Sequence, residues 1–319
     1  MDLDLQKLLV ILGPTSLGKT DLALQLAKKL NGELVSCDSR QVYKKLDIGT
    51  GKMPGEKVEV AKGRGFWEMD EIKVWMHDVA DPNRQYTVYD YVKDANRAVE
   101  DTLNRGKLPI IVGGTGFYLK ALLEGLSNLS VPANLKLRKH LESLSLKEMQ
   151  KKIEEISSQK WGKMNNSDRQ NPRRLVRAIE VVLQQPQKIR QINSKLKNCN
   201  ILKIGLTAPR AVLYKRIDDR VVDRLDQGLI EEVEQLYKDG LSLERMKQLG
   251  LEYGVLADYL ERKNTNREEL IKRLQGKIHG FARRQITWFK KEKNTLWFDI
   301  TDKNYLVRIE KTVRKWYDT

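Results

Sequence analysis

The chain has 319 residues, of which 40% are hydrophobic, enough to bury the core of one large domain or two modest ones. Its longest uninterrupted apolar stretch, 8–12, is far too short to cross a bilayer, and no secretion leader is recognised, so neither a membrane nor a secreted protein is expected. Cys37 and Cys199 form no CxxC pair, and the three histidines lack zinc-ligand spacing. We therefore expect a cytoplasmic protein without a disulfide or a zinc site.

The formal charge of +16 is unevenly distributed along the chain. Residues 1–130 are neutral overall, whereas 131–200 carry a net charge of +10 and 261–293 a net charge of +7. Each phosphate contact made by Lys or Arg releases counterions, so basic segments joined to a neutral module favour a polyanionic partner larger than a metabolite. The alternative is that Lys-rich helices are simply solvated. Arginine clusters and aromatic residues in the basic segments favour nucleic acid.

The first part of the chain alternates strands and helices. Short apolar runs predict three buried strands, and apolar residues at helical spacing predict two helices. In chain order these are strand 8–12, helix 21–30, strand 33–37, helix 89–105 and strand 108–112. A loop dotted with glycines is expected over 49–65. Strands that alternate with helices indicate a parallel α/β sheet.

From residue 119 to about 196 the pattern is helical, and strand-like runs are absent. The amphipathic helix candidates are 134–144, 146–156 and 173–183. Strands return at 201–206 and 296–300, with mostly helical sequence between them. We therefore expect an α/β core in two parts, 1–120 and 201–319, interrupted by a basic, all-helical insertion domain, 121–200.

The strongest chemical signal is a GxxxxGK[ST] motif between the first predicted strand and the first predicted helix. It consists of Gly13, Pro14, Thr15, Ser16, Leu17, Gly18, Lys19 and Thr20. Backbone N–H groups of such a loop and of the helix N-terminus bind a diphosphate or triphosphate. Lys19 adds a positive charge, and the hydroxyl of Thr20 can ligate Mg²⁺. The motif predicts a P-loop NTPase-like core and phosphate binding, but not the molecule that carries the phosphate.

Two further groups directly follow predicted strands, where the carboxyl ends of a parallel sheet form the ligand-binding edge. Asp38 follows the second strand, and its carboxylate can ligate Mg²⁺ or accept a proton; capping of the next helix is the alternative. Glycines 113, 114 and 116 surround Thr115 after the third strand. They allow close approach of a ligand to which Thr115 can donate, and a plain strand-to-helix turn is the alternative.

Arg216 and Arg220 lie four residues apart on a predicted helix and so share one face, as pairs that clamp oxyanions do. Because three aspartates lie close by, ordinary surface ion pairing is the alternative. Another helix carries arginines that are expected to point outward, since its apolar residues fall on a different face; these are Arg173, Arg174 and Arg177. A third segment mixes basic and aromatic groups typical of nucleic-acid surfaces, and includes Arg283, Arg284, Gln285 and Trp288.

Together these motifs resemble those of the bacterial tRNA dimethylallyltransferases. The matching segments are GPTSLGKT (13–20), DSRQVY (38–43), DIGTGK (47–52), IVGGTGFYLKALLEGL (111–126), RRLVRAIEV (173–181), the stretch from RIDDRV to GLIEEV (216–233) and FARRQITWF (281–289). They span most of the chain in the family's order, and the last two distinguish this family from generic P-loop kinases. The family usually has Gly-Tyr-basic-Glu where this chain reads Gly-Leu-Glu-Tyr at 250–253, and the stretch 53–75 is longer than usual.

The resemblance implies transfer of a dimethylallyl group from dimethylallyl diphosphate to N6 of an adenosine. In the family this adenosine lies 3′-adjacent to the anticodon of tRNAs that read codons beginning with U. Asp38 would be the base, and Lys19, Mg²⁺ at Thr20 and Arg220 would stabilise the departing diphosphate. The anticodon stem-loop is the implied partner of a monomeric enzyme. The implied tRNA-binding residues are Asp38, Ser39, Arg40, Gln41, Thr115, Arg138, Arg173, Arg174, Arg177, Lys247, Arg283, Arg284, Gln285 and Trp288.

Three rival functions remain at this stage. An adenylate isopentenyltransferase, which makes cytokinin, would not need the basic insertion or the FARRQITWF segment. A P-loop kinase or ATPase would use Lys19 and Thr20 but usually needs a carboxylate after an apolar strand, and no fully convincing run of this kind is present. An RNA-binding protein with a vestigial P-loop would have no reason to keep Lys19, Thr20 and Asp38 intact.

Overall fold

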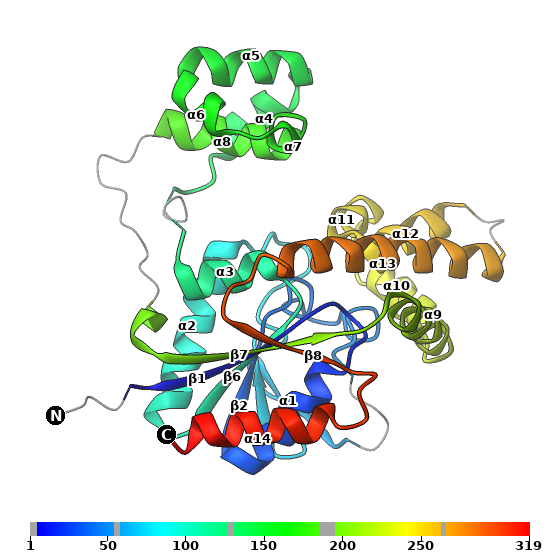
Figure 1. The fold of residues 1–319 in the computed structure, drawn as a ribbon. Helices are drawn as coiled ribbons and strands as arrows, with labels where there is room; N and C mark the ends of the chain where they lie inside the picture. Colours follow the sequence, from blue (N-terminus) through cyan, green and yellow to red (C-terminus); the bar gives the residue numbers. More distant parts are fainter. Residues whose placement is uncertain (1–4, 54–57, 127–130, 185–194, 263–265) are drawn as a thin grey trace. The chain divides into compact units, whose positions relative to one another are not determined.

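The structure is a computed structural model that describes residues 5–53, 58–126, 131–184, 195–262 and 266–319 (Figure 1). Contacts within the chain divide it into two compact units. The core unit comprises 1–123 and 195–319, and the insertion comprises 124–194, which compares with the expected 121–200. No helix within the described residues is long and apolar enough to span a bilayer.

An eight-stranded sheet forms the centre of the core unit, in the order β3-β4-β5-β2-β6-β1-β7-β8. Its strands are β1 (Lys7–Leu12), β2 (Gly32–Ser36), β3 (Val60–Lys62), β4 (Phe66–Met69), β5 (Ile72–Trp75), β6 (Leu108–Gly113), β7 (Asn200–Thr207) and β8 (Thr295–Asp299). All pairings from β5 to β8 are parallel, which confirms the predicted α/β core. The apolar run 8–12 is completely buried, as expected for a strand covered on both faces.

The other edge of the sheet is an antiparallel extension that the sequence pattern does not predict. β4 pairs antiparallel with β5, and β3 with β4. The prediction of a loop over 49–65 is therefore wrong at β3; residues 54–57 of that loop lie outside the described residues. Asp70 and Glu71 join β4 to β5 with φ values of 47° and 64°. Two consecutive residues at positive φ are typical of a type I′ turn, but this one lacks the glycine that usually marks it.

Helices cover the sheet and continue beyond it (Figure 1). They are α1 (Lys19–Leu30), α2 (Val88–Asn104), α3 (Gly116–Glu124), α9 (Arg210–Asp226), α10 (Leu229–Lys238), α11 (Leu243–Leu249), α12 (Leu251–Glu261), α13 (Arg267–Phe289) and α14 (Tyr305–Tyr317), with a short 3₁₀ helix at Lys195–Asn198. α9 follows directly on β7 and packs against α13, which in turn packs against α12. This group of helices therefore starts from the carboxyl edge of the sheet, where the P-loop also lies.

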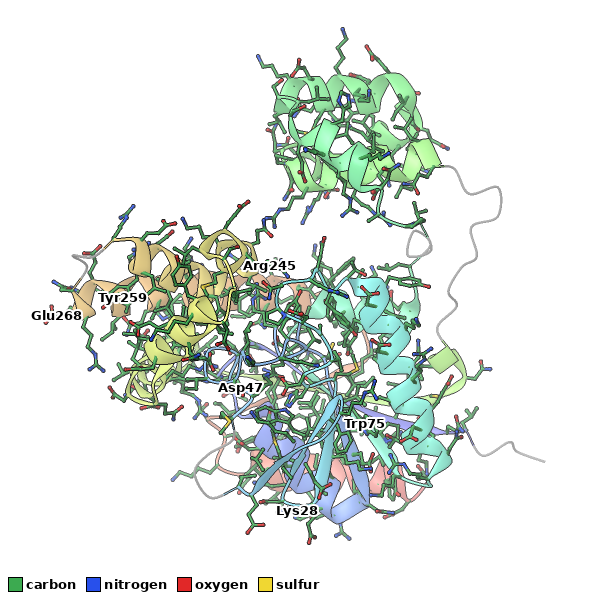
Figure 2. All side chains as sticks on the ribbon, turned by 180° about the vertical axis from the view of Figure 1, so that it is seen from behind. Lys28, Asp47, Trp75, Arg245, Tyr259 and Glu268 are labelled. Atoms are coloured by element: carbon green, nitrogen blue, oxygen red, sulfur yellow. The ribbon has the colours of Figure 1, made fainter. Side chains whose placement is uncertain are left out.

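Long-range polar contacts fix the periphery of the core unit, and Figure 2 labels two residues that make them, Trp75 and Arg245. Trp75 of β5 donates through Nε1 to the carboxylate of Glu33 at 2.8 Å. On α11, Arg245 donates to the carbonyl oxygens of Pro82 and Arg84, both at 2.8 Å. The two hydrogen bonds of Arg245 join α11 to the loop before α2.

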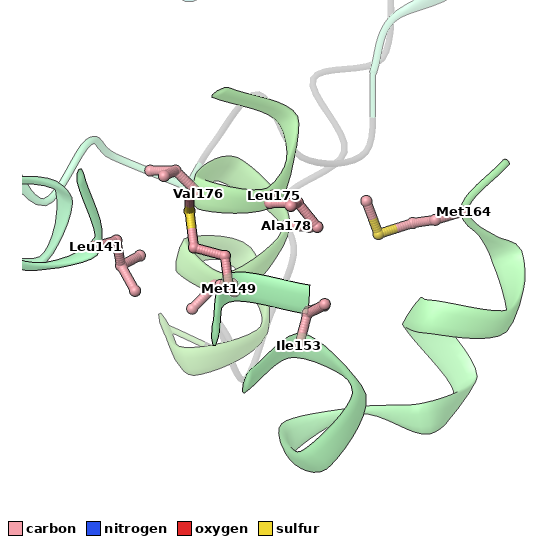
Figure 3. Close-up of a cluster of buried hydrophobic side chains, with 8 residues drawn as sticks. Leu141, Met149, Ile153, Met164, Leu175, Val176 and Ala178 are labelled. Carbon is pink, nitrogen blue, oxygen red and sulfur yellow. The ribbon is translucent and has the colours of Figure 1, made fainter. Parts of the chain in front are cut away.

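The insertion is helical throughout its described part, as predicted. Its helices are α4 (Leu135–Glu142), α5 (Leu146–Ile156), α6 (Ser158–Lys163), α7 (Asn166–Arg169) and α8 (Pro172–Gln184). Ser145 and Glu148 form a capping box that starts α5. Apolar side chains from the helices form one buried cluster (Figure 3), which consists of Leu141, Met149, Ile153, Met164, Leu175, Val176, Ala178 and Ile179. The insertion thus has a hydrophobic core of its own.

Candidate active site

The P-loop connects β1 to α1 at the carboxyl edge of the sheet. Gly13 has a φ of +138°, and a Cβ at this position would lie 2.5 Å from the carbonyl oxygen of Leu206 on β7. Gly18, at a φ of 75°, is the N-cap of α1. Both positions need glycine, because another side chain would be strained or would collide with the sheet. The loop therefore holds its backbone close to the start of α1, whose N-terminus favours anions.

A cavity of about 460 Å³ lies at this edge. The residues lining it that concern the chemistry are 15–20 of the P-loop, Asp38, Gln41, Arg216, Arg220 and Gln285. The structure thus brings the predicted phosphate loop, the predicted base and the predicted arginine pair to one cavity. All of these residues belong to the core unit.

Lys19 provides a positive charge inside this cavity. Its Nζ donates to the carbonyl oxygen of Pro14 at 2.7 Å, which folds the side chain back over the loop. Desolvation and the positive charge of Arg220 lower the pKa of Lys19 to about 8, against the opposite effect of Asp38. The ammonium group therefore remains largely protonated at pH 7, and a bound anion would favour its charged form further.

Arg216 and Arg220 both reach the P-loop from α9. The Nε of Arg216 donates to the carbonyl oxygen of Ser16 at 2.7 Å, and a guanidinium nitrogen of Arg220 lies 3.5 Å from the hydroxyl of Thr15. Neither arginine takes part in an ion pair within the described residues. The alternative of ordinary surface ion pairing is therefore not what the structure shows, and both cations face the place where an anion would bind.

Asp38 uses one carboxylate oxygen for the local fold and leaves the other available. Oδ1 accepts from the backbone N–H of Arg40 at 2.8 Å and more weakly from that of Gln41 at 3.4 Å. It caps a turn rather than the helix that the sequence alternative assumed. Oδ2 has no hydrogen-bond partner among the described residues. Because Asp38 lines the cavity, this oxygen can accept a proton from a ligand there.

Thr115 and Gln285 tie the turns around the cavity together. The hydroxyl oxygen of Thr115 accepts from the N–H of Ser39 at 3.1 Å. Gln285, at 5% exposure, donates to the carbonyl oxygen of Gly114 at 2.8 Å and accepts from the N–H of Thr15 at 2.9 Å. Gln285 is predicted to bind tRNA; its mostly buried amide connects α13 to the P-loop and lines the cavity.

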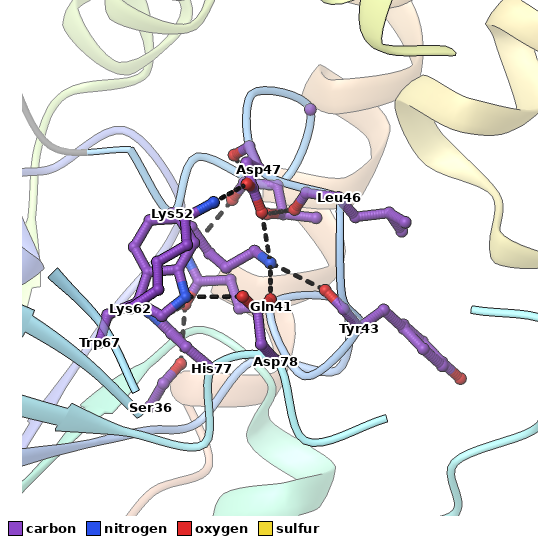
Figure 4. A network of polar contacts seen from close by, with 12 residues as sticks. Ser36, Gln41, Tyr43, Leu46, Asp47, Lys52, Lys62, Trp67, His77 and Asp78 are labelled. Atoms are coloured by element: carbon purple, nitrogen blue, oxygen red, sulfur yellow. Dashed lines mark hydrogen bonds and ion pairs between the residues drawn. The ribbon is translucent and has the colours of Figure 1, made fainter. Parts of the chain in front are cut away.

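A buried polar network forms part of the wall of the cavity (Figure 4). The fully buried side chain of Lys52 forms ion pairs with Asp47 and Asp78 and donates to the carbonyl oxygen of Tyr43 at 2.8 Å. Gln41 donates from Nε2 to two carbonyl oxygens of the loop 50–51 at 3.3 Å. This network holds the DIGTGK segment in place. The sequence does not predict this structural role of the network, although the DIGTGK motif contains two of its residues, Asp47 and Lys52.

His77 lies in the same wall and is buried. Its Nε2 is 3.3 Å from Oε1 of Gln41, and burial together with the nearby charge of Lys52 lowers the pKa of His77 to about 3. The imidazole is therefore neutral at physiological pH and cannot contribute a positive charge to the cavity.

Comparison with known proteins now decides the family. The family model described as "IPP transferase" matches residues 41–292, and a second, described as "Isopentenyl transferase", matches residues 6–72. The chain belongs to the IPP transferase family. A "tRNA dimethylallyltransferase 2" of Treponema denticola is 41% identical to this IPP transferase over 289 residues, covering 89% of this chain and 92% of the relative. A "tRNA dimethylallyltransferase" of Bacillus cereus is 35% identical over 305 residues, covering 93% and 91%.

Solved structures of the same family share the fold of this IPP transferase. The full-length tRNA isopentenylpyrophosphate transferase of Bacillus halodurans superimposes with a TM-score of 0.69 at 32% sequence identity and covers 98% of this chain and 97% of its own. A eukaryotic dimethylallyltransferase acting on tRNA gives a TM-score of 0.77 at 25% identity, covering 96% of this chain and 77% of its own. These relatives favour a tRNA-prenylating enzyme over a cytokinin synthase or a kinase.

In the insertion of this IPP transferase, two of the predicted RNA-binding arginines neutralise a buried carboxylate. Glu180 is 0% exposed and accepts from Arg138 at 2.8 and 2.9 Å, from the N–H of Asn134 at 2.6 Å and from Arg177. Burial raises the pKa of Glu180, but these donors outweigh it and keep the pKa below its ordinary value. Arg177 therefore does not simply point outward as predicted, and both arginines have a structural partner.

The remaining predicted RNA-binding side chains lie at or near the surface. Arg173 is exposed, and Arg174 is exposed although it pairs with Asp168 at 2.6 Å. Lys247 forms an ion pair with Glu261 at 2.6 Å. Trp288 is 37% exposed and meets Phe117 edge to face with ring centroids 6.4 Å apart.

Two arginines share the aromatic ring of Phe281 on α13. The guanidinium carbons of Arg40 and Arg284 each lie 5.9 Å from its centroid. Arg283, in the same segment, donates to the hydroxyl of Tyr214 at 3.3 Å. Cations and aromatic rings thus lie close together in this segment, which we predict to bind nucleic acid.

The segment that departs from the usual family pattern, 250–253, lies mostly inside this IPP transferase. Glu252 is 7% exposed and Tyr253 is 0% exposed. Tyr253 donates to Glu232 at 2.8 Å, whose carboxylate also accepts the N–H groups of 47–49. The acidic residue in place of a basic one therefore lies beneath the surface.

The donor set at the P-loop fits Mg²⁺. Mg²⁺ typically keeps several waters and is held by one or two protein oxygens together with substrate phosphates. The Thr20 hydroxyl and the free oxygen of Asp38 line the same cavity, whereas the described residues contain no cluster of three His, Cys, Asp or Glu side chains that could hold a metal. Such a site suits an ion that arrives with a diphosphate better than a permanent structural metal.

Proposed function

We propose that this chain transfers a dimethylallyl group from dimethylallyl diphosphate to N6 of the adenosine 3′-adjacent to the anticodon, in tRNAs that read codons beginning with U. The observation that carries the proposal is the cavity in which the P-loop, Asp38 and the arginine pair of α9 lie together. The names of the family's relatives support tRNA as the acceptor. The basic insertion and the basic segment of α13 supply the charge that such a polyanion requires.

The P-loop holds the diphosphate of the donor rather than ATP. Backbone N–H groups at the start of α1 bind its oxygens, and Lys19, Arg216 and Arg220 offset its charge. Negative charge grows on the diphosphate as the allylic C–O bond breaks. Cations that are already fixed in a cavity stabilise this charge without reorganisation during the reaction.

Asp38 removes the proton of the acceptor. The exocyclic amine of adenine is a poor nucleophile because its lone pair is delocalised into the ring. N6 attacks the allylic carbon, the C–O bond breaks with its electron pair going to the diphosphate, and the N6 proton passes to Oδ2 of Asp38. The products are N6-(dimethylallyl)adenosine and diphosphate. The adenine must leave the stack of the anticodon loop to reach this cavity.

Thr20 and the bound diphosphate would hold Mg²⁺. When bound, the ion neutralises part of the diphosphate charge and so helps this group to leave. We also propose that the protein acts as a monomer. We further propose a cytoplasmic location, which a tRNA substrate supports.

A transfer assay tests this function. Dimethylallyl diphosphate labelled in the prenyl group is offered with unmodified tRNA and free AMP side by side, with and without excess ATP. We expect label in tRNA alone, at a rate that ATP reduces little. Label in AMP would indicate a cytokinin-type enzyme. Hydrolysis of ATP without transfer to either acceptor would contradict the proposal.

A further inference from the structure

α9 carries another arginine, Arg224, one turn beyond Arg220. Arg224 is 7% exposed, and one of its guanidinium nitrogens donates both to the carbonyl oxygen of Gly49 at 3.0 Å and to Oε1 of Glu252 at 2.8 Å. Glu252, on α12, is also 7% exposed. A buried guanidinium and a buried carboxylate therefore form an ion pair behind the cavity that binds the diphosphate.

The backbone at Gly51 brings this pair against Arg220. A Cβ at Gly51 would lie 2.0 Å from a guanidinium nitrogen of Arg220 and 2.3 Å from one of Arg224. Two cations thus approach the same small residue. Like charges at such proximity repel, and a carboxylate close by offsets this repulsion.

Glu252 is the carboxylate that offsets this repulsion. The charge of Arg224 and burial lower the pKa of Arg220 to about 9, and Glu252 exerts the largest opposing effect, ahead of Asp21 and Asp38. Of these carboxylates, Glu252 is the one with a direct ion pair to an arginine of α9. Asp21 and Asp38 instead line the cavity that the diphosphate would occupy.

We propose that Glu252 is a positioning residue that acts as the resident counter-charge of the Arg220–Arg224 pair and thereby sets how tightly the site holds diphosphate. Its carboxylate binds Arg224, which leaves Arg220 directed at the P-loop. The inference rests on the proposed function, because diphosphate is the anion that the site is taken to bind. When diphosphate enters, it supplies a second counter-charge to the same arginines.

The matched control is Glu232. Its carboxylate also supports the loop 47–52, by accepting three backbone N–H groups and the hydroxyl of Tyr253, but it makes no contact with the arginines of α9 within the described residues. Glu252→Gln and Glu232→Gln are both isosteric and remove one negative charge each. A purely structural role of Glu252 would make the two variants behave alike.

The experiment measures thermal unfolding and the affinity for inorganic diphosphate in the presence of Mg²⁺. We expect Glu252→Gln to lower the melting temperature of the free protein, to regain most of this loss when diphosphate is added, and to bind diphosphate about tenfold more tightly than the wild type, since one opposing charge is removed. Glu232→Gln should lower the melting temperature by the same amount with and without diphosphate. The double variant Arg224→Gln/Glu252→Gln lacks the unpaired buried charge and should return to wild-type affinity.

Unchanged diphosphate affinity in Glu252→Gln, with a melting temperature deficit that diphosphate does not relieve, would overturn the inference. So would a double variant that behaves like Glu252→Gln alone. A wild-type protein whose melting temperature does not respond to diphosphate at all would contradict the proposed function, and this inference with it.

Discussion

Arg216 donates through its Nε to the carbonyl oxygen of Ser16 at 2.7 Å, although the two residues lie 200 positions apart in the sequence. This contact places α9 over the P-loop. The helix that follows β7 therefore completes a site begun by β1, and contacts with the loop itself hold the cations of α9 in place. Preorganisation of this kind allows the charges to act on a leaving group without first having to move.

The first prediction concerns Arg220. Arg220→Ala should reduce the rate of prenyl transfer about 10²- to 10³-fold, because it removes a donor aimed at the developing charge of the diphosphate. Lys215→Ala is the control on the same helix, since Lys215 is exposed and pairs with Asp219. Steady-state kinetics with saturating tRNA measures both. Equal rates in the two variants would show that Arg220 takes no part in the reaction.

Gly51 offers a second prediction with a close control. Gly51→Ala should both destabilise the protein and slow transfer, because the new Cβ would collide with the guanidinium groups of Arg220 and Arg224. Gly106 has nearly the same φ, 68° against 65°, but nothing lies within 4 Å of its missing Cβ. Gly106→Ala should therefore be destabilised by backbone strain alone and should keep normal transfer activity. Thermal unfolding and transfer rates separate the two effects.

Gln285 and Arg284 are neighbours in the sequence that should respond in opposite ways. Gln285→Ala should cost about 1–3 kcal/mol of folding free energy, since the buried N–H of Thr15 and the carbonyl of Gly114 lose their partner. Arg284→Ala should leave stability unchanged and weaken tRNA binding, with a smaller dependence on salt. Urea unfolding and tRNA binding at several salt concentrations test the pair. A salt-dependent loss of tRNA affinity in Gln285→Ala would contradict its interior role.

Acid stability should depend on Glu33. This completely buried carboxylate accepts from Arg105, Trp75 and Lys107. Burial raises its pKa, but the donors, Arg105 first, prevail and lower it from its ordinary 4.5 to about 2. Since the pKa is lower in the folded chain, the stabilisation is complete above about pH 4.5 and is lost as the pH falls toward 2.

Glu33→Gln is therefore expected to be less stable than the wild type at pH 6 and to lose less further stability between pH 5 and pH 3. Glu155→Gln serves as the control, because Glu155 is exposed and only 3.7 Å from Lys151 in a surface ion pair. Melting temperatures across this pH range provide the measurement. Parallel pH profiles of Glu33→Gln and the wild type would contradict the assignment.

Much of the site could be predicted because its signals are local. The P-loop is a contiguous motif between a buried strand and a helix, and Asp38 directly follows a strand whose carboxyl end faces the ligand. Arg216 and Arg220 are four residues apart, so helical geometry alone places them on one face. The buried strands could also be predicted, since a run such as 8–12 is apolar without interruption.

What could not be predicted depends on contacts between distant segments. The hairpin of β4 and β5 turns at Asp70 and Glu71, which lack the glycine of the usual signal. Gln285 resembles its basic neighbours in the sequence, and only the approach of α13 to the P-loop gives its amide two interior partners. Arg177 likewise follows the pattern of an exposed cation until the burial of Glu180 is known. Such partners are set by tertiary packing.

The most direct test of the account is a single-turnover measurement with Asp38→Asn. The variant keeps the shape of the side chain and the oxygen that caps the turn at Arg40, but it removes the base. We predict that tRNA and dimethylallyl diphosphate bind with affinities close to those of the wild type, and that transfer within the preformed complex slows about 10²- to 10⁴-fold. Transfer at the wild-type rate would show that another group takes the N6 proton and would contradict the central claim.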